Sequence, residues 1–181
     1  MNALALIYLL CSGICLLLAS FVWARDSKSS VNRIFVVFCL AGTYWAFVDF
    51  GFRQSDTYET AAEWLKAFSF WPFAPALLLH FSLVFTEKSR LLRNKWTYVT
   101  LYLPALAFSL LDLTTDLMTV EPVKESWGWA FEAPATVAQY LADVWTGIVM
   151  ALSICLCLRY YMRDVDRQKK QQAKYVLIGI S

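Results

Sequence analysis

The sequence predicts an all-α, polytopic transmembrane helical bundle with five full spans, the start of a sixth, and its N-terminus outside. Two observations support this fold class. Of the 181 residues, 59% are hydrophobic and 17% are charged, whereas soluble domains have about 45–50% apolar and roughly 25% charged residues. In addition, 13 of the 16 Lys and Arg residues lie in three short segments, each separated from the next by two long apolar runs. Because basic residues at the ends of apolar spans stay on the cytoplasmic side, this alternation predicts orientation as well as location.

The three basic segments are residues 25–33, 88–95 and 159–174. The predicted inner side carries 13 basic and four acidic residues, a net charge of +9, and the outer side carries three basic and ten acidic residues, a net charge of −7. A basic cytoplasmic face is an ordinary consequence of membrane topology. We therefore do not interpret Lys169 and Lys170 as a nucleic-acid site. The predicted location is the plasma membrane, with an extracytoplasmic N-terminus.

Each span needs about 20 largely apolar residues. Inside lipid every backbone polar group must be bonded within its segment, and these runs are continuous, so we expect helices and not a β-barrel. The first run is followed rather than preceded by basic residues, which indicates an uncleaved span and not a signal peptide. A sixth run begins shortly before the last residue, and we interpret the chain as a fragment rather than as ending in an interfacial stub. The predicted spans are residues 3–24, 34–52, 64–85, 96–118 and 137–161, with a partial span over 175–181.

The third predicted span contains two prolines and the one histidine of the chain. Pro72 and Pro75 remove backbone donors, so we expect this helix to be kinked, and both prolines are hinge candidates. A single histidine cannot form a metal site or pair with a second histidine on haem. At its predicted depth, His80 is also out of reach of a soluble kinase domain. We interpret it as a neutral, hydrogen-bonded packing residue.

Several charged residues fall near the predicted outer ends of the spans, where an ionisable group faces the bundle interior or water. Asp49 and Arg53 are four residues apart in the second span, on the stripe that carries Trp45. Asp112 ends the fourth span, and Asp143 lies early in the fifth on a stripe of small residues that suits helix packing. We expect these four charges at one outer level. The Asp49–Arg53 pair has two interpretations, a structural ion pair and part of an outward-facing polar pocket.

The longest connection, about residues 113–136, is predicted to lie outside and carries a Trp-rich cluster. Three acids and one base beneath such a loop suit a cation or a polar amine, and the alternative is a solvated rim. The predicted partner is therefore an unidentified small ligand on the outer side. The predicted ligand-binding residues are Trp45, Asp49, Arg53, Asp112, Trp127, Trp129 and Asp143.

Other patterns that carry chemistry are absent from the sequence. It has no Gly-rich phosphate loop, no paired Cys or His metal spacing and no HExxH motif, so we predict no cofactor, no metal and no catalytic residue. All five cysteines fall inside apolar runs and are interpreted as packing residues. Besides the small ligand, the expected partner is the lipid bilayer, a homodimer is left open, and nucleic acid is excluded.

Three passages carry a resemblance to a known family. They are residues 70–85 (FWPFAPALLLHFSLVF), 127–129 (WGW) and 167–179 (RQKKQQAKYVLIG). Together they resemble the N-terminal seven-helix transmembrane sensor region of bacterial and archaeal histidine kinases. The resemblance covers the whole chain and implies two further helices, followed by a cytoplasmic transducer such as a kinase core. It carries over no catalytic residue, so this chain is not itself expected to be an enzyme.

We interpret the chain as the signal-input domain of a transmembrane signal transducer, a receptor of a two-component system whose catalytic part is absent from this sequence. In this hypothesis an outer signal binds between the second, fourth and fifth spans and the Trp-rich loop. One alternative is a fragment of a small-solute transporter or channel, which would show midplane polar residues and repeated halves. Another is a membrane anchor or assembly subunit with a stable partner.

Overall fold

The computed structural model describes residues 3–118, 120–132, 134–162 and 167–180. Most of these residues are helical, and one two-stranded antiparallel sheet is present among them. The elements are, in chain order, α1 (Ala3–Arg25), α2 (Ser30–Gln54), α3 (Tyr58–Ala67), the 3-10 helix η1 (Phe68–Phe70), α4 (Phe73–Phe85), α5 (Ser89–Leu92), α6 (Lys95–Thr114), β1 (Glu121–Glu125), β2 (Gly128–Glu132), α7 (Val137–Met162) and α8 (Arg167–Ile180).

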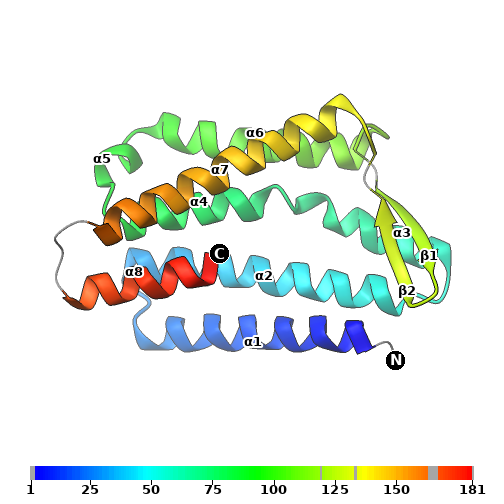
Figure 1. Cartoon of the computed structure of the whole chain (residues 1–181), viewed down its shortest axis with the longest axis horizontal. Coiled ribbons are helices and arrows are strands. Elements are labelled where there is room, and N and C mark those ends of the chain that lie inside the picture. The colour runs from blue at the N-terminus through cyan, green and yellow to red at the C-terminus, as the bar shows by residue number, and fades with distance from the viewer. Residues whose placement is uncertain (1–2, 119, 133, 163–166, 181) are drawn as a thin grey trace.

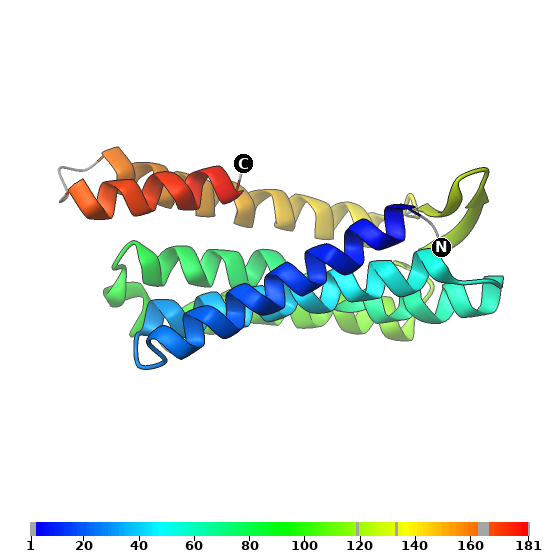
Figure 2. The same ribbon diagram turned by 90° about the horizontal axis from the view of Figure 1, so that it is seen from below.

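Five segments are long and apolar enough to cross a membrane, which confirms the predicted all-α polytopic bundle. They are α1, α2, the α3–η1–α4 unit, α6 and α7. The β1–β2 hairpin and the start of α1 lie at one end of the bundle, called here the hairpin end, and α5 lies at the other, called the α5 end (Figure 1). In the perpendicular view, α7 and α8 lie on one side of the bundle and α1 and α2 on the other (Figure 2).

Short polar turns force consecutive helices to pack antiparallel. Ser29 caps α2, because its hydroxyl accepts the backbone N–H of Asn32. Farther along the α1–α2 pair, near the middle of both helices, the Ser12 hydroxyl donates to the carbonyl of Thr43 at 3.0 Å. Such small polar residues allow two helices to approach closely and to satisfy their polar atoms against each other inside lipid.

The third span is interrupted, as its prolines predict. α3 ends at Ala67, η1 follows, and α4 starts at Phe73 with Pro72 at its N-cap position. Pro72 and Pro75 lack the N–H groups that a continuous α-helix needs, but a helix tolerates this loss in its first turn. The phenol of Tyr44 donates to the carbonyl of Ala67 at 2.7 Å. A side chain of α2 thus satisfies a backbone group where the helix breaks.

The connection between α6 and α7 differs from the irregular loop expected from the sequence, because it forms a β-hairpin. The strands pair from Glu121↔Glu132 to Glu125↔Gly128, and the two intervening residues make the turn. Gly128 has φ 139°, a conformation that favours glycine. Polar residues occupy most positions of β1, so the sequence shows no clear alternation to indicate a strand.

Several helix boundaries also differ from prediction. The second and third spans were predicted to start at residues 34 and 64, whereas α2 starts at Ser30 and α3 at Tyr58. The predicted fourth span reached residue 118, whereas α6 ends at Thr114 and the next residue is extended, with φ −138° and ψ 158°. The predicted sixth run began at residue 175, whereas α8 starts at Arg167. Hydropathy does not indicate that residues 167–174 belong to this helix, because most of them are polar. Their Gln, Lys and Arg residues nevertheless favour helix formation.

A compact cluster joins the hairpin to the helices. Phe52, Ala61, Leu65 and Trp129 are buried together and connect α2, α3 and β2. α2 approaches α3 closely at Gly51, where an added Cβ would lie 2.3 Å from the ring of Trp64. This packing holds the hairpin against the helix ends at the hairpin end of the bundle, where the predicted site residues lie.

Candidate ligand-binding site

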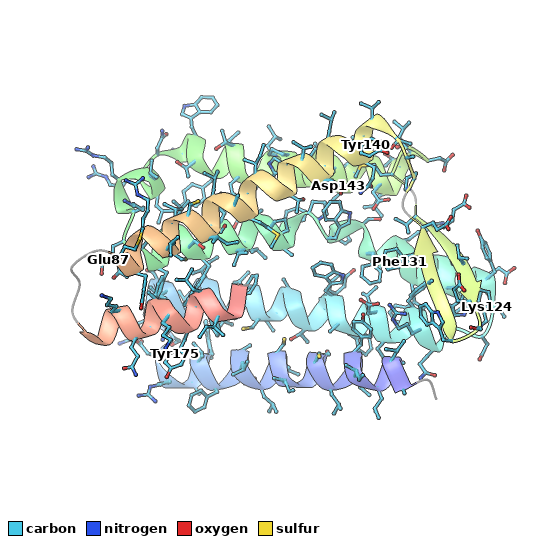
Figure 3. The ribbon with its side chains drawn as sticks, viewed as in Figure 1. Glu87, Lys124, Phe131, Tyr140, Asp143 and Tyr175 are labelled. Atoms are coloured by element: carbon cyan, nitrogen blue, oxygen red, sulfur yellow. The ribbon has the colours of Figure 1, made fainter. Side chains whose placement is uncertain are left out.

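A cavity of about 310 Å³ lies at the hairpin end, with walls from α1, α2, α3, η1, α6, β2 and α7. Phe131 on β2 and Asp143 on α7 both lie at this end of the bundle (Figure 3). The volume of the cavity is at the lower end of the range of small-molecule sites, roughly 300–1,000 Å³. The aromatic rings that line it are Tyr8, Trp45, Phe68, Trp71 and Phe131.

Arg53 connects the cavity to the hairpin. Its Nε lies 3.4 Å from Asp49 Oδ1, and the two side chains are only 10% and 13% exposed. Its Nη1 donates to the carbonyl of Trp129 at 3.1 Å. The guanidinium also lies 5.0 Å from the ring centre of Tyr8 and 5.6 Å from that of Trp127. An ion pair and two cation–π contacts therefore compensate the desolvation of this arginine.

The two tryptophans of the hairpin have different environments. Trp129 is buried, its Nε1 donates to the carbonyl of Ser55 at 2.6 Å, and Lys124 Nζ lies 4.3 Å from its ring centre. It packs the hairpin against the end of α2 and does not line the cavity wall. Trp127 is 48% exposed and lies at the turn, over Arg53. The hairpin is therefore anchored by one tryptophan and presents the other toward the arginine.

Asp112 and Asp143 complete the charged wall from α6 and α7. The Ser69 hydroxyl hydrogen-bonds to the Asp112 carboxylate. The Gln139 amide donates to Asp143 Oδ1 at 3.0 Å. Within the part of the chain that the structure describes, the one ion pair is Asp49–Arg53, so no cationic side chain pairs with either of these two carboxylates.

The charge balance and the ring content define what the cavity can bind. Three carboxylates and one guanidinium leave two negative charges beside aromatic faces, which attract cations. No group of three metal-ligating side chains is found in the described ranges 3–118, 120–132, 134–162 and 167–180. The arrangement therefore suits a larger organic cation better than a bare metal ion.

The family described as the N-terminal 7TM region of histidine kinase matches residues 7–181, nearly the whole chain. The chain belongs to this family. The match confirms the resemblance identified from the sequence and makes this a sensory transmembrane region of the histidine kinase type. No curated protein and no solved structure shows significant similarity to this sensor region.

The sensor region brings five of its predicted ligand-binding residues to one cavity wall. They are Trp45, Asp49, Arg53, Asp112 and Asp143. The other two, Trp127 and Trp129, contact Arg53 from the hairpin.

Seven residues of the wall were not predicted from the sequence, although one of them had a usable signal. They are Tyr8, Leu65, Phe68, Trp71, Val120, Phe131 and Gln139. Gln139 is four residues before Asp143 and shares its helical face, a pairing that helix periodicity predicts. Tyr8, Phe68 and Phe131 gave no such signal, because only the packing of distant elements brings them together.

His80 lies outside this cavity, toward the α5 end. Its Nδ1 and the Tyr102 hydroxyl are 2.8 Å apart, and its ring packs edge-on against that of Tyr98. The histidine therefore joins α4 to α6 through a hydrogen bond, as expected for a packing residue. Pro72 and Pro75 lie at the start of α4, and their use as a hinge remains a prediction.

Proposed function

We propose that the chain is the signal-input region of a transmembrane histidine kinase, and that its signal is a small organic cation that enters from the extracytoplasmic side. The observation that carries the proposal is the cavity at the hairpin end, where three carboxylates and one arginine lie among aromatic rings. In this proposal the lipid bilayer surrounds the bundle of five spans.

The proposed orientation rests on the distribution of charge. The basic segments 25–33 and 88–95 flank the helices at the α5 end, and the hairpin end carries most of the acids. By the positive-inside rule the α5 end faces the cytoplasm. The N-terminus and the cavity then face outward across the plasma membrane, where a soluble signal arrives.

The proposed ligand chemistry follows from the cavity wall. Arg53 and Asp49 cancel each other, so Asp112 and Asp143 set a net negative charge. The Oδ1 atom of Asp49 faces Arg53 Nε in the ion pair, so the carboxylates of Asp112 and Asp143 are the acceptors for an ammonium group. An anionic ligand would be repelled by this wall, whereas a cation is attracted to both its carboxylates and its rings.

α7 offers a direct route from the cavity to the α5 end. It carries Asp143 near one end and Tyr160 near the other, within a single helix. Near the far end, Cys157 Sγ lies 3.6 Å from Ser82 Oγ of α4, and the rings of Tyr160 and Phe85 are 5.5 Å apart. If the ligand binds more tightly to the conformation in which α7 has one of two positions, it shifts the protein population toward that conformation.

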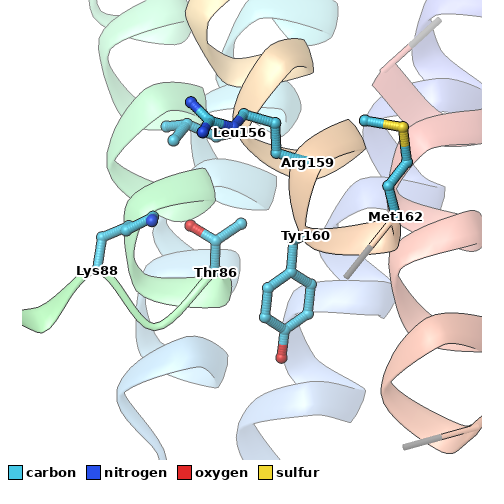
Figure 4. A pocket seen from close by; sticks show the side chains of 6 residues that line it. All are labelled: Thr86, Lys88, Leu156, Arg159, Tyr160 and Met162. Atoms are coloured by element: carbon cyan, nitrogen blue, oxygen red, sulfur yellow. The ribbon is translucent and has the colours of Figure 1, made fainter. Parts of the chain in front are cut away.

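The α4–α7 interface has room for such a displacement at the α5 end. A cavity of about 230 Å³ lies between the end of α4 and the last turns of α7 (Figure 4). Thr86 and Lys88 line it on the α4 side, and Leu156, Arg159 and Tyr160 line it on the α7 side. Because none of the described side chains fills this space, a shift of α7 against α4 would not overpack their interface.

Binding to the whole chain in phosphatidylcholine nanodiscs tests the proposal. The probes are tetramethylammonium, choline and benzyltrimethylammonium, and the measured quantity is the rise in Tm with probe concentration. Ligand at about 100 times Kd stabilises the folded state by about 2.7 kcal/mol. For at least one probe we expect Tm to rise with the logarithm of probe concentration above Kd. This rise should be lost in Asp143→Asn and kept in Glu125→Gln, which changes an exposed acid of the hairpin outside the cavity. No rise with any probe, or an equal rise in Asp143→Asn, would exclude the cation proposal.

The interrupted third span favours one second candidate, a transporter. Discontinuous helices form substrate sites in secondary transporters, and the α3–η1–α4 unit is discontinuous beside the cavity. Proteoliposomes that contain the chain and a radiolabelled probe cation distinguish the two functions. A sensor binds the cation without moving it across the membrane, so protein-dependent flux would favour the transporter.

A further inference from the structure

A second cavity, of about 610 Å³, lies at the α5 end on the surface formed by α2, α4 and the α5–α6 turn. One side of it is polar and the other is apolar. Val37 in the apolar wall is 46% exposed, so this side opens toward the membrane. The polar side contains Ser30, Arg33 and Arg93, and the apolar side contains Ile34, Val37 and Val84.

The two arginines come from different elements and converge on the same cavity. The Nε of Arg33 donates to the carbonyl of Ser27 at 2.8 Å, which holds the guanidinium at the start of α2. Arg93 lies in the turn between α5 and α6. Neither arginine forms an ion pair with an acid in the described part of the chain. Their remaining N–H donors suit a phosphate, which arginine binds through two parallel hydrogen bonds.

Other groups around the cavity favour an anion at its polar side. α2 begins at Ser30, so the positive end of its dipole lies beside Arg33. Glu87 is the one acid among the residues that line the cavity, against two arginines. The rings of His80 and Tyr98, which pack edge-to-face, also line the cavity and add an aromatic surface.

We propose that this groove binds an anionic phospholipid, with its headgroup phosphate at Arg33 and Arg93. The acyl chains lie along Ile34, Val37 and Val84 and continue into the bilayer. A free phosphate would use only the polar side, whereas a phospholipid matches both sides of the groove. Basic pockets between helices at the cytoplasmic surface are typical sites for anionic headgroups. The bound lipid would link the start of α2 to the α5–α6 turn.

Lipid retention by the full chain tests this site. The protein is exchanged into nanodiscs of equal phosphatidylglycerol and phosphatidylcholine, transferred to detergent, and its bound lipids are counted by native mass spectrometry. We expect wild-type protein to retain phosphatidylglycerol preferentially. Replacement of both arginines, Arg33→Gln with Arg93→Gln, is expected to reduce this preference about fivefold per arginine.

Two further variants separate the groove from general surface charge. The pair Arg90→Gln with Lys95→Gln removes two exposed cations at the same end that do not line the cavity, and it should retain the wild-type preference. The pair Arg33→Lys with Arg93→Lys keeps the charge but loses the paired hydrogen bonds to phosphate, so it should retain a preference for phosphatidylglycerol between those of the wild type and the Gln pair.

Two results would overturn the assignment. The first is an equal loss of preference in the Arg90→Gln, Lys95→Gln control. The second is a rise in Tm with inorganic phosphate in detergent as large as that with phosphatidylglycerol, since a phospholipid site uses the apolar wall as well.

Discussion

Gly51→Ala tests whether α2 and α3 approach as closely as the structure shows. The new Cβ would lie 2.3 Å from Trp64 Cε2 and 2.5 Å from two other ring atoms, well inside van der Waals contact. The ring cannot move freely, because it packs against Phe47 with ring centres 5.9 Å apart. Overpacking of this kind costs about 1–3 kcal/mol, and alanine returns up to about 1 kcal/mol of helix propensity.

An alanine control without the clash has the same propensity gain, so the packing cost of about 1–3 kcal/mol should appear as a Tm about 2–12 °C lower than that of the control. Gly147→Ala is the matched control, because nothing lies within 4 Å of its added Cβ. The assay is thermal unfolding of both variants in the same nanodiscs, followed by circular dichroism. A Gly51→Ala variant as stable as Gly147→Ala would refute the close α2–α3 packing that positions the cavity wall.

Three further substitutions test individual contacts by the same assay. Arg53→Gln leaves Asp49 buried without its partner and should cost about 3 kcal/mol, with much of the loss recovered when Asp49→Asn is added; additive losses would contradict the ion pair. Trp129→Phe removes the indole hydrogen bond to the α2 C-cap and should lower the free energy of unfolding by about 1 kcal/mol. Amide hydrogen exchange across the hairpin should become faster, and unchanged exchange would show that the indole does not anchor the hairpin. Tyr102→Phe should cost about 1 kcal/mol by removing the hydroxyl bonded to His80, and an unchanged Tm would argue against that bond.

The spans could be predicted from the sequence because the bilayer imposes one simple rule on them. A continuous apolar run of about 20 residues has one stable form in lipid, so the five spans follow from run length alone. The contact between Asp49 and Arg53 could also be predicted, because residues four apart in a helix lie next to each other on its surface.

Contacts between distant elements could not be predicted by such rules. Tyr8 meets Arg53 only because α1 packs on α2 in one particular register. Phe131 reaches the wall because the α6–α7 connection is a hairpin, and the mostly polar β1 strand carries little signal of its own. The prolines predicted a distortion of the third span, but not that Tyr44 would satisfy the broken end of α3.

Photolabelling tests the central claim, that the cavity at the hairpin end binds an organic cation. A benzyltrimethylammonium derivative that carries a diazirine is bound to the chain in nanodiscs and irradiated, and the labelled peptides are sequenced. We predict labels on the aromatic residues of the wall, at Tyr8, Trp45 and Phe131, all suppressed by excess unlabelled cation. Labels confined to other positions, or labels that excess cation does not reduce, would contradict the proposed site.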